Sequence, residues 1–444
     1  MIVVHEGDCR AVLASLSAAS LDACITDPPY HLTTGKRGGS GPASASSRTP
    51  QGRSRIGTGF MGKAWDGGTV AADPATWAAV LRVLKPGAHL LAFGATRTYH
   101  RMTCAIEDAG FEIRDCIRSE QEAEAWPGWL YGCGMPKSRD MAKAIDIEGG
   151  TPGTYGEAKS KAHAGWIERG RMRGETGDDG WQRPWMADPD QVANAARRYI
   201  PGSLEATAWQ GWGTGLKPAW EPIVVARKPF RGTVASNVLL HGTGALHIDA
   251  CRIEANGRPA RLTLLGGLDT PGKAIYGQGG SGTGSAAAGT TDLGRWPANV
   301  VHDGSDQVEA AFAAAGARGA ASPVRGTESS APVANGIYDV RGRVAGPFHA
   351  DRGSPSRFFF SGKATKAHRA GSKHPTVKPI PILQHLVRLV TPPGGVVLDP
   401  FAGCGTLGAA ALLEGFGAVL IERDPDFAAD CRRRFVPAPL ELVA

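Results

Sequence analysis

Strand-like and helix-like segments alternate at both ends of this chain, with a long stretch rich in Gly, Ala, Ser and Thr between them. Each short apolar run is followed by a segment of helical periodicity, as in repeated βαβ units. This alternation predicts an α/β fold with one doubly wound, mostly parallel sheet built from both termini. The expected strands lie at 2–5, 21–26, 89–93, 111–117, 129–131, 223–226, 396–398 and 418–421, and the expected helices at 11–16, 74–84, 99–109, 381–390, 406–414 and 425–434. A Pro-Gly turn at 85–87 is expected to end the 74–84 helix.

The composition narrows the kind of partner and site. The net charge of +7 and the isoelectric point near 9.0 favour an anionic partner. Eight Cys occur without any Cys-x-x-Cys pair, so neither a metal site nor a disulfide framework is expected. The sequence contains no signal segment and no window of about 18 apolar residues, which predicts a cytoplasmic protein without membrane contact.

A glycine-rich turn follows the predicted strand 396–398. Gly403 and Gly405 would let the backbone approach a ligand at the start of the next helix, and Asp399 ends the strand before them. Glu422 ends the following strand, where an acid can bind ribose hydroxyls. Gly408 completes a G-x-G-x-x-G pattern, so hydride-transfer cofactors and a plain tight turn both stay open at this point.

The tetrapeptide Asp27-Pro28-Pro29-Tyr30 follows the predicted strand 21–26. A carboxylate, two rigid imino acids and an aromatic ring at a strand end suit the holding of a planar, amine-bearing ring. Taken alone, the two prolines would also fit an ordinary turn after a strand. The tetrapeptide therefore indicates a function only in combination with the glycine turn at the other end of the chain.

Together these segments resemble the amino-methyltransferases among the S-adenosylmethionine-dependent DNA methyltransferases, in the β-type order where the catalytic motif precedes the cofactor motif. The matching segments are 7–9, 26–30, 82–87, 129–137, 221–228, 374–379 and 399–405, with Glu422. Cys404 departs from the pattern, since many relatives have Ser there, but both side chains are small. The resemblance implies a Rossmann-like sheet in which strand 396–398 lies beside strand 21–26, and S-adenosylmethionine as cofactor.

The resemblance also implies roles for single residues. Asp399, Phe401, Gly403 and Gly405 would surround the cofactor and Glu422 would bind its ribose. Asp8 would contact its adenine end, and the alternative interpretation of Asp8 is a helix N-cap only. Lys378 would lie over the carboxylate of its methionine moiety.

Asp27, Pro28, Pro29 and Tyr30 would form the catalytic motif. The Asp27 carboxylate and the Pro28 carbonyl would accept the hydrogens of an exocyclic base amine, and the Tyr30 ring would stack on the base. The base would first be flipped out of duplex DNA. The 33–59 loop, with Lys36, Arg37, Arg53 and Arg55, would close over it.

The predicted organisation has five segments. A catalytic half at 1–145 is followed by an insertion at 146–205, a return to the core at 206–231, a target-recognition region at 232–372 and a cofactor-binding half at 373–444. Phosphate or base contacts are expected from basic side chains of the fourth segment. The candidates are Arg252, Arg295, Arg357, Lys363 and Lys366.

Several functions stay open. The resemblance favours adenine N6 as the methylated amine, because in this family an Asp at the head of the tetrapeptide, here Asp27, goes more often with adenine and Ser more often with cytosine N4. Cytosine N4 is the alternative. An RNA or protein amine methyltransferase and a catalytically inactive DNA-binding protein are the other interpretations. Double-stranded DNA is the expected partner, and the resemblance leaves a homodimer and a cognate restriction endonuclease open.

Overall fold

The computed structural model describes most of both ends of the chain and parts of its middle. The described residues are 1–30, 69–120, 124–126, 129–131, 140–159, 161–169, 189–214, 220–253, 258–263, 285–291, 296–302, 310, 360–361, 366–374 and 376–435. The 33–59 loop, which was predicted to close over the base, lies outside them.

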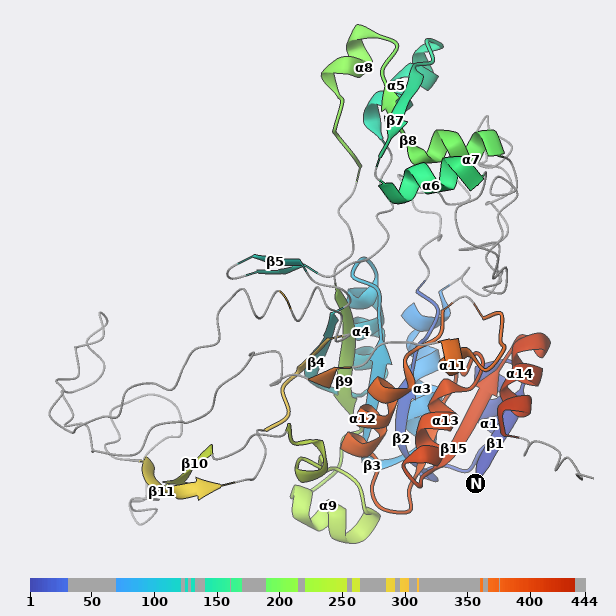
Figure 1. Cartoon of the computed structure of the whole chain (residues 1–444). Coiled ribbons are helices and arrows are strands. Elements are labelled where there is room, and N and C mark those ends of the chain that lie inside the picture. The colour runs from blue at the N-terminus through green and yellow to red at the C-terminus, as the bar shows by residue number, and fades with distance from the viewer. Residues whose placement is uncertain are drawn as a thin grey trace, which may run out of the picture.

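A nine-stranded sheet forms the centre of the fold (Figure 1). Across the sheet the strands are β1 (Ile2–Glu6), β15 (Gly417–Glu422), β14 (Val396–Asp399), β2 (Leu21–Thr26), β3 (Leu84–Phe93), β9 (Trp220–Arg227), β4 (Glu112–Glu120), β12 (Val300–His302) and β13 (Phe360–Ser361). Every neighbouring pair is parallel except the two that involve β9, which runs antiparallel to both β3 and β4. The predicted mostly parallel sheet is confirmed.

Helices cover both faces of this sheet, because side chains alternate along each strand. Cys24 on β2 points into the cluster that contains Trp77, whereas its neighbours Ala23 and Ile25 point into the cluster that contains Leu386. The first face carries α1 (Cys9–Ser15), α3 (Pro74–Val83) and α4 (Tyr99–Asp108), and the second carries α12 (Ile380–Val390), α13 (Thr406–Leu413) and, through its buried Cys431, α14 (Pro425–Phe435). The doubly wound α/β architecture is therefore confirmed.

The two ends of the chain meet at the middle of the sheet. Val397 and Leu398 of β14 pair in parallel with Ala23 and Cys24 of β2. From β14 the order proceeds through β15 to β1, and from β2 it proceeds the other way to β3, so the winding reverses between β14 and β2. Ligand sites of open α/β sheets lie outside the carboxyl ends of the strands at such a point. The predicted adjacency of these two strands is confirmed.

One local prediction is wrong. The helix ends at Val83 as expected, but the expected turn at 85–87 is part of β3, where the pairing with β2 shifts register between Leu84 and His89. Lys85 reaches the Asp22 carboxylate over 2.6 Å and Gly87 donates to the Lys228 carbonyl over 3.0 Å, which holds the segment against the sheet.

The 232–372 segment is also more regular than its composition suggests. It supplies β12 and β13, and β12 pairs with β4 through Val301 opposite Ser119. The Val301 side chain is buried, so this strand extends both the backbone ladder and the core beyond β4.

Residues 140–214 contain a small unit of their own, drawn at the top of Figure 1. Its elements are α5 (Met141–Gly149), β7 (Thr154–Ala158), α6 (Lys161–Arg169), α7 (Pro189–Ala196), β8 (Arg197–Ile200) and α8 (Leu204–Ala208). Its centre is the buried Asp146 carboxylate, which accepts hydrogen bonds from Tyr199 and from the backbone and hydroxyl of Ser203. The predicted 146–205 insertion falls within this unit.

The remaining described elements lie outside the sheet and this unit. They are the hairpin of β5 (Glu124–Trp126) and β6 (Trp129–Tyr131), the hairpin of β10 (Arg258–Thr263) and β11 (Ser285–Thr291), helices α9 (Val234–His241) and α11 (Lys366–Arg369), and single turns at Val70–Ala72 and Asp249–Cys251. Among the described helices, none has the length and apolar character needed to cross a membrane.

Candidate active site

The predicted cofactor residues meet at the carboxyl ends of β14 and β15. Gly403 and Gly405 have φ angles of +54° and +79°, which L side chains rarely adopt, and they form the turn between β14 and α13. The Gly403 N–H donates to Glu422 Oε2 over 2.7 Å, and the Asp424 N–H donates to Oε1 over 2.8 Å. Burial raises the pKa of Glu422. The glycine turn and the predicted ribose-binding acid are thus joined directly.

Asp399 links this turn to the strand that carries the tetrapeptide. Its Oδ1 accepts the Thr26 hydroxyl over 2.7 Å and the Phe401 N–H over 3.0 Å. The carboxyl is buried, and burial raises the pKa of Asp399 to about 7. Asp399 therefore joins the two halves of the sheet at the point where the winding reverses.

This buried carboxyl should make stability depend on pH. The native pKa lies above that of an unfolded aspartate, so the folded chain binds the extra proton and loses stability as pH rises toward 7. Between pH 5 and pH 8 the loss from this one group should be about 3 kcal/mol. We expect Asp399→Asn to remove this part of the slope of the free energy of unfolding against pH, as measured by urea unfolding at both pH values. Equal slopes for the variant and the natural chain would contradict this assignment.

Asp8 lies beside the same edge of the sheet. The preceding Gly7 N–H donates to the Glu422 carbonyl over 2.9 Å, so the chain leaves β1 next to the end of β15. The exposed Asp8 carboxylate caps α1 by accepting the N–H groups of Arg10 and Ala11. The capping role is established, and contact with the adenine end of a cofactor stays a prediction.

The tetrapeptide follows β2, directly beside Asp399. Its conformation is held in part by Thr98, whose hydroxyl donates to the Tyr30 carbonyl over 2.8 Å. Asp27 Oδ2 lies 3.3 Å from Lys378 Nζ. Asp27 Oδ1 is buried and has no hydrogen-bond partner among the residues that the structure describes. A buried acceptor without a partner is costly, so this atom is available for a donor supplied by a ligand.

Lys378 and Glu221 complete a charged cluster with Asp27 and Tyr30. Lys378 Nζ donates to Glu221 Oε1 over 2.6 Å and to the Tyr30 hydroxyl oxygen over 2.9 Å. The Tyr30 hydroxyl in turn donates to Glu221 Oε1. The ammonium also lies 4.6 Å from the centre of the Phe93 ring. The charged cluster therefore contains two carboxylates, one ammonium and one phenol.

The charged cluster shifts the pKa values of its members. Burial raises the pKa of Asp27, the Lys378 ammonium opposes that rise and the Glu221 carboxylate adds to it. Burial alone would lower the pKa of Lys378, but Asp27 and Glu221 raise it. Burial also raises the pKa of Tyr30, together with the two carboxylates. Lys378 is therefore a cation and Tyr30 a neutral hydroxyl at neutral pH.

The sequence did not single out Glu221, although the segment that contains it belongs to the resemblance. The available signal was a carboxylate two positions before the apolar run 223–226 of a predicted core strand. For Lys378, the structure shows contacts with Asp27, Glu221 and Tyr30. Its contact with the carboxylate of the cofactor stays a prediction.

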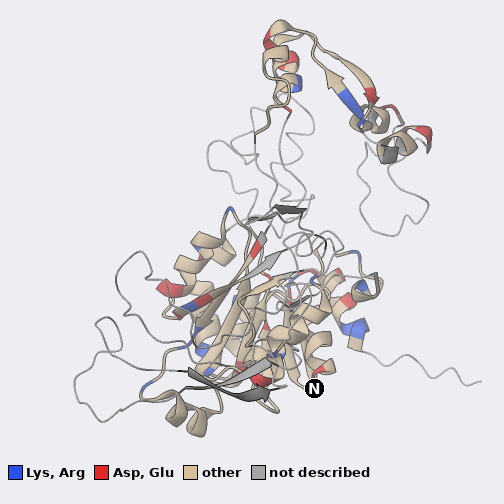
Figure 2. Ribbon diagram, turned by 60° about the vertical axis from the view of Figure 1, so that its left-hand side comes forward, with Lys and Arg blue, Asp and Glu red and all other residues tan. Residues whose placement is uncertain are grey.

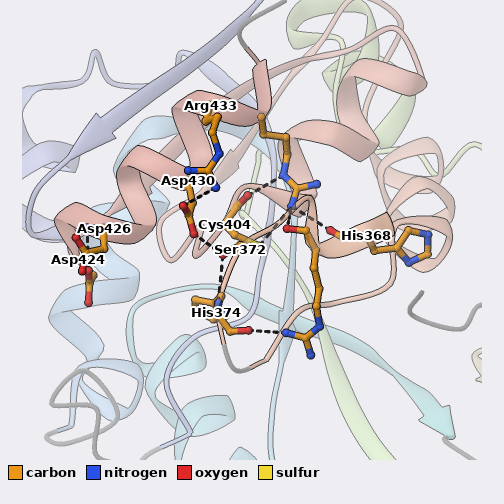
Figure 3. A network of polar contacts seen from close by, with 10 residues as sticks. His368, Ser372, His374, Cys404, Asp424, Asp426, Asp430 and Arg433 are labelled. Carbon is orange, nitrogen blue, oxygen red and sulfur yellow. Dashed lines mark hydrogen bonds and ion pairs between the residues drawn. The ribbon is translucent and has the colours of Figure 1, made fainter. Parts of the chain in front are cut away.

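A polar network supports the glycine turn on the side of α14 (Figure 3). Arg434 on α14 donates to the carbonyls of Cys404 over 2.8 Å and His368 over 3.0 Å. Ser372 donates to Asp430 over 2.5 Å, which ties the segment after α11 to α14.

The segment after α11 also touches the turn itself. The His374 ring packs on Gly403, where an added Cβ would come within 3.1 Å of its Nε2, and lies 4.5 Å from the Phe427 ring. The turn is thus held between α14 and the segment that leads to Lys378.

Few of the predicted DNA contacts can be located. Arg252 pairs with Asp249 over 2.8 Å and lies 5.3 Å from the centre of the Trp296 ring, with 18% of its side chain exposed. Lys366 begins α11. Lys36, Arg37, Arg53, Arg55, Arg295, Arg357 and Lys363 lie outside the described residues. Basic and acidic residues are interspersed over the described ribbon (Figure 2). In this part of the chain no group of His, Cys, Asp and Glu could hold a metal ion.

A family model described as DNA methylase matches residues 342–432, which include Lys378, the glycine turn and Glu422. This part of the chain is therefore similar to the DNA methylase family. The predicted resemblance to the N6 and N4 DNA methyltransferases is thereby confirmed for this part of the chain, and the Asp27–Tyr30 tetrapeptide lies outside the matched range.

Two curated proteins resemble shorter stretches of the chain. Type II methyltransferase M2.MboI of Moraxella bovis is 36% identical over 63 residues, which are 14% of this chain and 23% of that protein. Putative methylase YubD of Escherichia coli (strain K12) is 49% identical over 49 residues, or 11% of this chain and 22% of that protein. The chain thus spans less than a quarter of the length of these relatives.

Solved DNA methylase structures align with the chain at low similarity. PvuII DNA methyltransferase (cytosine-N4-specific) has a TM-score of 0.39 and 11% identity, with 98% of this chain and 87% of that one covered. The putative DNA modification methylase TTHA0409 from Thermus thermophilus, complexed with S-adenosyl-L-methionine, has a TM-score of 0.35 and 14% identity, with 98% and 95% covered. At these scores the two structures carry no argument about this chain.

Proposed function

We propose that the chain is an S-adenosylmethionine-dependent DNA methyltransferase that methylates the exocyclic amine of a base. The observation that carries the proposal is the buried Asp27 Oδ1, which has no hydrogen-bond partner within the described part of the chain and belongs to the tetrapeptide beside the glycine turn. An amine hydrogen is the donor that such an acceptor lacks. The DNA methylase family of residues 342–432, and the names of the two relatives, support the same reaction.

The residues around the glycine turn fit S-adenosylmethionine. Each oxygen of Glu422 accepts one backbone N–H, and a carboxylate oxygen retains a further lone pair for a ribose hydroxyl. Gly403 and Gly405 present backbone without side chains at the start of α13, where a ligand can approach closely. When bound, the cofactor supplies a methyl group on a positively charged sulfur.

The tetrapeptide would prepare the amine for attack. The lone pair of an exocyclic amine is conjugated with the ring and is therefore a poor nucleophile. Asp27 Oδ1 and the Pro28 carbonyl would each accept one amine hydrogen and favour tetrahedral nitrogen, and the Tyr30 ring would stack on the base. Asp27 is then the group that takes the proton which the nitrogen loses.

Adenine N6 is our preferred target because Asp27 heads the tetrapeptide, and cytosine N4 is the alternative. DNA should be incubated with the chain and S-adenosylmethionine, digested to nucleosides and analysed by mass spectrometry. We expect 6-methyladenine. Detection of 4-methylcytosine alone would overturn the adenine proposal and leave the methyltransferase proposal standing.

The substrate is proposed to be duplex DNA from which the target base is flipped out. The unstacking cost is a few kcal/mol and would be offset by stacking on Tyr30. Competition between duplex DNA and tRNA or rRNA for binding to the chain tests this choice, because preferred binding to RNA would favour an RNA methyltransferase.

A homodimer, a cognate restriction endonuclease and a cytoplasmic location are further proposals, and sedimentation of the purified chain tests the first of them.

A further inference from the structure

We propose that Glu221 and Lys378 are positioning residues for the reaction: they hold Asp27 and Tyr30 so that a single carboxylate oxygen, Asp27 Oδ1, faces the base amine. The inference rests on the proposed function and extends it to two residues outside the tetrapeptide. The first comes from β9 and the second from the segment before α12.

The Lys378 ammonium lies among three oxygens of the charged cluster. An ammonium has three N–H donors, and Nζ meets three acceptors: Asp27 Oδ2 at 3.3 Å, Glu221 Oε1 at 2.6 Å and the Tyr30 hydroxyl at 2.9 Å. Only 13% of the side chain is exposed. Lys378 therefore occupies Oδ2 and fixes the carboxylate plane, which leaves Oδ1 as the acceptor for an amine.

Glu221 reaches the charged cluster because β9 is antiparallel. The carboxyl ends of β2 and β3 lie at one edge of the sheet, and an antiparallel strand brings its amino end there. Glu221 is the second residue of β9, two positions before Ile223, which pairs with Phe93 at the end of β3. A parallel strand in the same place would put this side chain at the opposite edge.

Glu221 binds both of its partners through one oxygen. Oε1 accepts from the Lys378 ammonium and from the Tyr30 hydroxyl. The phenol is thus held at its far end, which fixes the plane of the ring that would stack on the base. With the Thr98 bond to the Tyr30 carbonyl, both ends of this residue are fixed.

The charges around Asp27 affect whether its carboxylate can accept the proton that the reaction releases. The amine nitrogen would form a bond to the methyl carbon as the bond from that carbon to the positively charged sulfur breaks and leaves a neutral thioether. The nitrogen then loses one proton to Oδ1, and Asp27 returns it to water after the product leaves. Asp27 must therefore be ionised at the start. The charged groups around it are Lys378, Glu221 and Asp399, which ends the neighbouring strand β14, while Tyr30 is neutral. Lys378 favours the ionised form of Asp27 and the two carboxylates oppose it.

Two variants should move the pH profile in opposite directions. Lys378→Met removes the cation that lowers the pKa of Asp27, so the acidic limb of kcat should move to higher pH. Glu221→Gln removes a carboxylate that raises this pKa, so the acidic limb should move to lower pH. In both variants kcat at its optimum should fall by up to about 100-fold because the reacting groups are no longer held in place.

The controls are matched ion pairs away from the charged cluster, at the amino end of β2 and at the C-terminal end of α13. Glu414 is 14% exposed and pairs with Arg388, much as Glu221 is 16% exposed and pairs with Lys378. Lys85 pairs with Asp22 at 2.6 Å, at the amino end of β2. Glu414→Gln and Lys85→Met should leave the pH profile unshifted.

Two further measurements separate positioning from cofactor binding. Calorimetry should give near-natural cofactor affinity for Glu221→Gln. Infrared titration of the Asp27 carboxyl without cofactor should show the same two opposite shifts in the two variants.

The outcomes separate the two proposals. An inactive natural chain on all DNA tested would overturn the proposed function. An active natural chain whose two variants show unshifted or equally shifted acidic limbs would overturn the positioning role alone. If either variant fails to fold, as judged by circular dichroism, Glu221→Asp and Lys378→Arg replace them. These variants retain the charge, so the acidic limb of kcat should lie near its natural pH, while kcat itself is reduced.

Discussion

Asp27→Ala should lower methyl transfer by about 1,000-fold or more while cofactor affinity changes little. The carboxylate supplies both the acceptor Oδ1 and the base for the departing proton, and such groups contribute about 100-fold to 10,000-fold. Its only described ion pair is with Lys378, whereas the glycine turn is held by Glu422 and Asp399. Single-turnover transfer of a radiolabelled methyl group and calorimetric cofactor titration measure the two effects.

The control for Asp27→Ala is Glu107→Ala, which removes an exposed carboxylate from α4 on the outside of the sheet. That variant should keep natural activity. An Asp27→Ala chain with natural turnover would refute the role assigned to the tetrapeptide, and loss of cofactor binding in that variant would show that Asp27 serves the cofactor site instead.

Gly405→Ala should destabilise the fold and weaken cofactor binding together. A φ of +79° costs an L residue about 1 to 2 kcal/mol, and the new Cβ would lie 2.6 Å from Cys431 Sγ on α14. The turn and α14 must then separate, so the dissociation constant for S-adenosylmethionine should rise by at least about tenfold, which corresponds to about 1.4 kcal/mol. Thermal unfolding and calorimetry measure the two changes.

Gly415 offers a matched control. It has nearly the same φ, +80°, but an added Cβ there meets nothing within 4 Å. Gly415→Ala should therefore show the backbone strain alone and leave cofactor affinity unchanged. Adding Cys431→Ala should relieve part of the cost of Gly405→Ala, and strict additivity of the two changes would argue against the close contact.

Much of the fold followed from local pattern. The apolar runs at 21–26, 396–398 and 418–421 became β2, β14 and β15 with bounds within about one residue, because each is buried and bounded by turn residues. The pairing of β14 with β2 came from the resemblance, since nothing in either strand alone specifies its partner. β12 was missed because such a short strand leaves almost no periodicity to detect.

The candidate site was predicted less completely than the fold. Asp399, Gly403, Gly405 and Glu422 lie on adjacent strand ends, where the βα pattern puts them. Glu221 could not be inferred in the same way, because its position depends on the antiparallel direction of β9 and on a contact with Tyr30 across 191 residues. Such a contact is set by tertiary packing.

The pairing between the two ends of the chain also governs how the protein can be made. β1 pairs with β15, Ile2 opposite Ala418, and β2 pairs with β14. Contacts of such high sequence separation carry a large entropy of loop closure, so they form slowly. On a ribosome the tetrapeptide can lie beside β3 early, but the glycine turn follows much later, because Thr26 and Asp399 are 373 residues apart. A chain that stops before β14 is therefore expected to be inert toward DNA.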